Sequence, residues 1–83
     1  MKMYNFKNVE NIESFLNEIG ANIELKLKES NDCFVEMTNE FGDSDYFLSF
    51  NELNNYANEQ LSVLVQSGLN KELVEELIEE FTF

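Results

Sequence analysis

Basic residues are scarce in this chain. Its 83 residues include five lysines, no arginine and no histidine, against seventeen acidic residues, and the formal net charge is −12. Histidine is the usual general base of enzymes at neutral pH, and arginine is the usual clamp for phosphate groups. Because both are missing, we expect no enzymatic activity and no cofactor.

Cysteine and long apolar runs are also scarce. Cys33 is the one cysteine, so an intramolecular disulfide and a cysteine-based metal cluster are excluded. Strand alternation places Cys33 on an apolar face, where a buried thiol is inert. Residues 1–13, MKMYNFKNVENIE, lack the apolar core of a signal peptide, and no apolar run approaches membrane-spanning length. We therefore expect a cytoplasmic protein that does not associate with membranes.

The residues that are present favour a folded domain. Hydrophobic residues make up 43% of the chain and aromatic residues 13%, as in globular proteins, and a length of 83 residues is enough for one modest core and too small for two. We expect a single domain over residues 1–83.

The negative charge is unevenly distributed. Residues 1–28 hold four lysines and four glutamates, whereas residues 29–83 hold thirteen acidic residues and only Lys71. Such charge repels nucleic acid and anionic membranes. We therefore expect no direct binding to nucleic acid and a partner that is basic.

Hydrophobic periodicity predicts the order α-β-β-β-α-α. A first helix starts near Asn8, and Gly20 suits its C-terminal end. Alternation predicts strands over residues 23–28 and 33–41, a turn at residues 30–32, and a short aromatic strand, YFLSF, over residues 46–50. The expected fold is α+β, a three-stranded antiparallel meander with one face covered by helices. The side chains expected on its buried side are Ile23, Leu25, Leu27, Cys33, Val35 and Met37.

Two further helices follow the strands. Ser49 and Glu52 form a capping box, with Leu48 and Leu53 at the flanking staple positions, so a helix is predicted from Phe50 to Ser67. Asn70 caps the last helix, KELVEELIEEF, with Leu69 and Val74 as a second staple. Its expected apolar stripe is Leu73, Val74, Leu77, Ile78 and Phe81.

The acidic turn NEFGDSDYF resembles a calcium loop only superficially. An EF-hand loop that starts at Asp43 needs an oxygen ligand at Phe47, glycine at Leu48 and a carboxylate at Asn54, and all three are missing. We expect no metal site.

The last helix carries more charge than its stability favours. Glu72, Glu76 and Glu80 form one i, i+4, i+8 row, and Glu75 with Glu79 forms a neighbouring row. Each such pair destabilises a helix by about 0.2–0.5 kcal/mol, and acids near the C-terminus oppose the helix dipole. One interpretation is a solvated face that keeps an acidic protein soluble. The other is an anionic surface whose regular carboxylates occupy a groove built for phosphates. This surface would include the turn residues Glu40, Asp43 and Asp45, and Glu36 would extend it.

The size, acidity and expected element order resemble those of small phage-encoded anti-CRISPR proteins, which include inhibitors of Cas9. The resemblance implies a DNA mimic that binds a CRISPR effector, Cas9 or a type I surveillance complex, in the cytoplasm of the bacterial host. By position in the fold, it points to the second β-turn and to the glutamate row of the last helix. Cas9-type effectors hold nucleic acid in positive channels, where stoichiometric occlusion suffices.

Other functions remain open. The same charge suits an acidic immunity protein or antitoxin that neutralises a basic nuclease toxin, and a phage protein whose acidity is incidental is a third reading. The common expectation is a basic nucleic-acid-binding protein as partner, met by a monomer or homodimer. The predicted contact residues are Glu36, Glu40, Asp43, Asp45, Glu72, Glu75, Glu76, Glu79 and Glu80.

Overall fold

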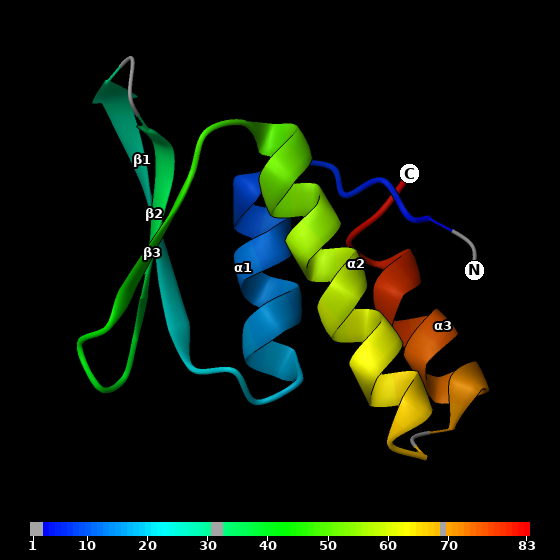
Figure 1. Ribbon diagram of the computed structural model, residues 1–83. Helices are drawn as coiled ribbons and strands as arrows, with labels where there is room; N and C mark the ends of the chain where they lie inside the picture. The colour runs from blue at the N-terminus through cyan, green and yellow to red at the C-terminus, as the bar shows by residue number, and fades with distance from the viewer. Residues whose placement is uncertain (1–2, 31–32, 69) are drawn as a thin grey trace.

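The computed structural model describes residues 3–30, 33–68 and 70–83 and confirms the predicted order of elements. Figure 1 shows the sheet on one side of the molecule, α1 and α2 in the middle, and α3 on the far side. The domain is therefore a layered α+β fold. Its elements are α1 (Val9–Glu18), β1 (Ile23–Ser30), β2 (Cys33–Asn39), β3 (Ser44–Phe47), α2 (Phe50–Gln66) and α3 (Lys71–Glu79).

Each helix begins at the polar residue predicted to cap it. The side chains of Asn8, Ser49 and Asn70 each accept a hydrogen bond from a backbone N–H in the first turn of the helix that follows. These bonds satisfy donors that a helix start otherwise leaves open.

The sequence predicts two hydrophobic staples, one between Leu48 and Leu53 and one between Leu69 and Val74. Leu48 is 64% exposed whereas Leu53 is buried, so Leu48 does not provide the expected buried contact. Glu52 is the second residue of the predicted capping box. Its carboxylate accepts a hydrogen bond from the Leu48 N–H at 2.8 Å. Leu69, the other predicted staple residue, lies outside the described residues.

The sheet is an antiparallel meander in the order β1-β2-β3. The predicted strand over residues 46–50 is wrong at both ends, because β3 runs from Ser44 to Phe47 and α2 already starts at Phe50. The early start is caused by Asn39, whose side-chain oxygen accepts hydrogen bonds from the N–H groups of Phe41 and Asp43. This closes the turn early, so that pairing resumes at Ser44. The predicted turn at residues 30–32 includes Asn31 and Asp32, which lie outside the described residues.

The core lies between the sheet and the helices. Two residues expected in it are exposed, Leu27 at 65% and Leu73 at 60%, and Cys33 is only half-buried. Leu27 lies on the outer strand of the sheet, and the buried side of α3 centres on Val74 and Ile78. The fully buried apolar residues are Phe6, Ile12, Phe15, Leu16, Val35, Met37, Leu53, Ala57, Leu61, Val74 and Ile78.

The segment before α1 is fixed by contacts that local patterns do not indicate. Phe6 pairs with Thr82 in an isolated antiparallel bridge, and the Phe6 ring lies 5.2 Å from that of Phe15. Two buried asparagines of α2, Asn54 and Asn58, hydrogen-bond to its backbone. The two ends of the described chain therefore meet beside α2, as Figure 1 shows.

Candidate functional site

The predicted glutamates of the last helix share one surface. Glu72, Glu75, Glu76, Glu79 and Glu80 are all exposed, and we call them the α3 acidic face. At about 100° per residue, they span an arc of about 140° around the helix axis. The buried residues Val74 and Ile78 lie on the opposite side. Burial of that apolar side fixes the rotation of α3, so all five carboxylates face outward.

No described basic group neutralises the α3 acidic face. Among residues 3–30, 33–68 and 70–83, the one ion pair joins Lys28 to Glu36, with Nζ and Oε1 3.9 Å apart. Lys71 begins α3, and no basic residue occurs in the last turn. Within the described part of the chain, no ion pair therefore offsets the charge of these five carboxylates.

An apolar rim, formed by Met3 and Phe83, lies at the edge of a mostly polar hollow beside the α3 acidic face. Glu75 and Glu79 line a hollow of about 440 Å³ together with the N-terminal segment and the last residues of the chain. Phe83 is 91% exposed and Met3 is 55% exposed at this hollow. A basic side chain of a partner would find carboxylates for its charge and apolar surface for its methylene stem.

The acidic turn lies elsewhere. Glu40 and Asp43 are exposed between β2 and β3, and Figure 1 places that turn on the opposite side of α1 and α2 from α3. The molecule measures 38 × 28 × 19 Å along its principal axes. The structure thus does not bring the turn and the α3 acidic face into one surface.

Asp45 belongs to neither group. It lies in β3 opposite Met37, outside the turn in which it was predicted. Burial raises the pKa of Tyr56 on α2, and the nearby charges of Asp45 and Glu59 raise it further. The Asp45 charge therefore acts on a residue of α2.

Glu36 differs from the other predicted contact residues because it is already engaged within the sheet. Besides its ion pair with Lys28, its carboxylate accepts a hydrogen bond from Tyr46, and this bond and its charge raise the pKa of the Tyr46 hydroxyl. Its charge is thus partly compensated within the sheet.

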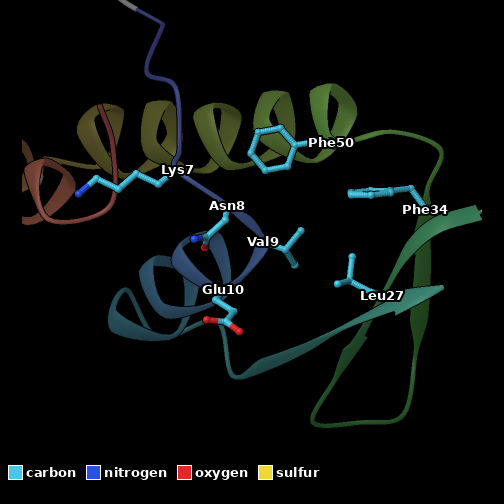
Figure 2. Close-up of a pocket in the computed structure, with 7 residues that line it drawn as sticks. All are labelled: Lys7, Asn8, Val9, Glu10, Leu27, Phe34 and Phe50. Carbon is cyan, nitrogen blue, oxygen red and sulfur yellow. The ribbon is translucent and has the colours of Figure 1, made fainter. Parts of the chain in front are cut away.

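Sequence reasoning missed a groove between the sheet and the starts of α1 and α2. It measures about 560 Å³, and Figure 2 shows Val9, Leu27, Phe34 and Phe50 facing the same hollow. Phe34 was the available signal, since it interrupts the polar side of its strand. The lining residues are Lys7, Asn8, Val9, Glu10, Leu27, Phe34 and Phe50.

Other kinds of site find no support in the described residues. No three His, Cys, Asp or Glu side chains of residues 3–30, 33–68 and 70–83 gather where they would hold a metal ion. No helix in the same part of the chain is both long and apolar enough to cross a membrane. No protein-family model, curated protein sequence or solved structure matches this chain. A functional proposal therefore has to come from the geometry and charge of its surfaces.

Proposed function

We propose that this protein is a stoichiometric inhibitor that presents the α3 acidic face to the basic, nucleic-acid-binding groove of another protein. One observation carries the proposal: five exposed carboxylates occupy one side of a short helix, and no described basic group pairs with them. This arrangement costs helix stability through like-charge repulsion, so local folding does not explain it.

The spacing of the carboxylates suits a groove that binds a phosphate backbone. Glu72, Glu76 and Glu80 recur every four residues, or about 6 Å along the axis, and Glu75 with Glu79 adds a parallel row. A nucleic acid strand carries one charge per roughly 3.4 Å. Two adjacent rows approach this density more closely than one row does.

The most concrete partner is a CRISPR effector, Cas9 or a type I surveillance complex, which would make the protein a phage anti-CRISPR. Such effectors hold nucleic acid in positively charged channels. The inhibitor needs no catalysis, because occupying the channel excludes the DNA. Opposite charges make association fast and sensitive to salt.

The apolar rim favours a second candidate, an acidic immunity protein or antitoxin that neutralises a basic nuclease. Phe83 and Met3 are exposed at the hollow beside the α3 acidic face, and Leu73 is exposed on α3 itself. Exposed aromatic anchors are typical of interfaces between proteins. A DNA mimic depends on the carboxylates, whereas this alternative depends equally on the rim. Phe83→Ala and Leu73→Ala therefore distinguish the two candidate functions. These substitutions should weaken binding strongly only if the protein is an immunity protein or antitoxin.

The test is displacement of DNA from purified effectors, Cas9 and a type I complex, with a basic nuclease as a third target. The double variant Glu76→Lys with Glu79→Lys should weaken competition by about tenfold or more at low salt. Charges at the periphery of an interface set the association rate, and close charge pairs set the affinity. Glu40→Lys with Asp43→Lys changes the net charge equally at the distant turn and serves as the matched control. We expect the control to retain most of the competition.

Two results would contradict the proposal. The first is that no target releases its DNA. The second is that both double variants lose competition equally, because the total charge and not the α3 acidic face would then be responsible. Circular dichroism of each variant verifies that α3 still folds.

A further inference from the structure

The outer edge of β1 is covered by α1 over its first half. β1 is an edge strand of the sheet, so the backbone groups on its outer side have no strand partner. The side-chain amide of Asn17 accepts a hydrogen bond from Ile23 N–H at 2.8 Å and donates one to Ile23 C=O at 3.0 Å. One turn earlier in α1, the Glu13 carboxylate accepts a hydrogen bond from Leu25 N–H at 2.7 Å.

This cover ends before Leu27. Every second N–H of a strand points to the same side, so the Leu27 N–H points outward like those of Ile23 and Leu25. Among the residues that the structure describes, none forms a hydrogen bond with it. Helix α1 begins at Val9. Val9 and Glu10 of its first turn border the groove and form no hydrogen bond with Leu27 that the structure describes.

The groove lies directly beside this open part of the edge. Leu27 lines it and is 65% exposed. Figure 2 shows the Phe34 and Phe50 rings and the Val9 side chain around the same space, while the Lys7 amine points away. An open strand edge next to an apolar hollow is the arrangement that binds an extended peptide, with backbone bonds to the edge and a side chain in the pocket.

We propose that β1 binds an extended segment of a partner protein at Leu27, with an apolar side chain of that segment in the groove. The charge of β1 specifies the segment further. Lys26 and Lys28 flank Leu27 and are exposed, and Lys26 is the one of the two that has no ion pair within the described residues, since Lys28 pairs with Glu36. Opposite charges on neighbouring strands stabilise a pair. The preferred occupant therefore alternates acidic with apolar residues.

The same charges argue against a second copy of this chain. If two β1 strands paired antiparallel through the open edge with their Leu27 residues opposite each other, Lys26 of each strand would be directly opposite Lys28 of the other. Like charges at that position are destabilising. The segment also differs from the basic partner of the α3 acidic face, so the two interactions are independent.

The experiment uses a display library of random dodecapeptides as the probe, selected against the full chain. We expect enriched peptides to alternate acidic and apolar residues and to shift the amide resonance of Leu27 in ¹H–¹⁵N spectra. The absence of any enriched peptide, or shifts centred on α3, would overturn the proposal.

Two variants separate the backbone bond from the side chain. Leu27→Pro removes the outward N–H while leaving the β1–β2 hydrogen bonds in place, since proline is tolerated on an open edge. Leu27→Ala keeps the N–H and shortens the side chain. We expect Leu27→Pro to bind the selected peptides about tenfold more weakly than Leu27→Ala, as the loss of one hydrogen bond implies.

Equal affinities of these two variants would contradict strand addition. If Leu27→Pro does not fold, the charge-reversed variant Lys26→Glu with Lys28→Glu tests the proposal in its place. Selection against that variant should enrich alternating basic and apolar peptides, and an unchanged acidic preference would refute the proposed register.

Discussion

Asn54 and Asn58 show how single buried residues fix the N-terminal segment. Asn58 accepts a hydrogen bond from Tyr4 N–H at 2.8 Å and donates to Tyr4 C=O at 2.9 Å. Asn54 accepts a hydrogen bond from Phe6 N–H at 2.9 Å. Both side chains are 4% exposed, so water cannot easily replace these bonds. The two side-chain amides therefore bond to the backbone of Tyr4 and Phe6 in the way that a neighbouring strand would.

We predict that Asn58→Ala lowers the free energy of unfolding by about 1–3 kcal/mol, because it removes the hydrogen bonds that a buried amide makes to the Tyr4 backbone. Urea denaturation measures the change. Asn55→Ala is the matched control, since Asn55 lies on the exposed side of the same helix and its loss should change stability by less than about 0.5 kcal/mol. Equal losses in both variants would contradict this role for Asn58.

A second prediction at this scale concerns Tyr46. The hydrogen bond to Glu36 and the Glu36 charge raise the Tyr46 pKa above 10.0. The folded protein then keeps a proton that the unfolded chain loses, so the contribution to stability is present below pH 10.0 and is lost as pH rises further. Glu36→Gln should lower the Tyr46 pKa toward its ordinary value.

Phenolate absorbance, followed as pH rises in a background with Tyr4→Phe and Tyr56→Phe, measures this titration, because Tyr46 is then the one remaining tyrosine. Glu76→Gln on α3 is the control, because Figure 1 places α3 on the far side from the sheet. If Glu36→Gln leaves the titration unchanged, the carboxylate is not the cause of the raised pKa.

At the level of the elements, α3 combines a favourable start with an unfavourable end. Asn70 caps the helix and Glu72 lies in its first turn, where a negative charge stabilises the dipole. Glu79 and Glu80 lie at the opposite end, where a negative charge destabilises it. The helix is held by the burial of Val74 and Ile78, which keeps its acidic side turned to solvent.

We predict opposite effects on stability and on binding from one substitution. Glu80→Lys should raise the free energy of unfolding by about 0.5–1 kcal/mol, because it removes a like-charge pair with Glu76 and complements the dipole. It should also weaken binding to the basic partner. Glu72→Lys is the control, and it should give no such gain, because it loses the favourable charge at the helix start.

Thermal unfolding and the DNA-displacement assay measure the two quantities on the same samples. If Glu80→Lys gained stability and kept its full inhibitory activity, Glu80 would belong to the solvated surface and would have no binding role.

For the whole molecule, charge is the dominant property. A formal charge of −12 on 83 residues opposes the compact state through self-repulsion. Salt screens exposed charges, with a Debye length of about 10 Å at 0.1 M. Folding and binding to a basic partner should therefore respond to salt in opposite directions.

We predict that the melting temperature rises by several degrees between about 0.01 M and 0.5 M sodium chloride, since 1 kcal/mol corresponds to about 4–8 °C in a domain of this size. Scanning calorimetry measures the shift. A variant with glutamine at Glu40, Glu59, Glu75 and Glu76 carries four fewer negative charges and should respond less. An equal response in both proteins would mean that salt acts through something other than this repulsion.

The predictions that held depend on residues a few positions apart. Helix starts at Asn8, Ser49 and Asn70 were correct, because a cap bonds the backbone only two or three residues away. Strand alternation identified Val35 and Met37 as buried for a similar reason, since neighbouring side chains must point to opposite faces. The start of β3 was wrong, because the side-chain bonds of Asn39 close the turn early and let pairing resume at Ser44, before the apolar pattern of residues 46–50.

The chain alone therefore specifies the elements, their order and the excess of negative charge. It does not specify which carboxylates share a surface: packing keeps the glutamates of α3 together, separates them from Glu40 and Asp43, and pairs Glu36 with Lys28. The bonds from Asn54 and Asn58 and the groove around Phe34 and Phe50 likewise join residues far apart in the chain. Local patterns report the conformation of neighbours, whereas these arrangements arise only when distant segments bury their apolar sides against one another.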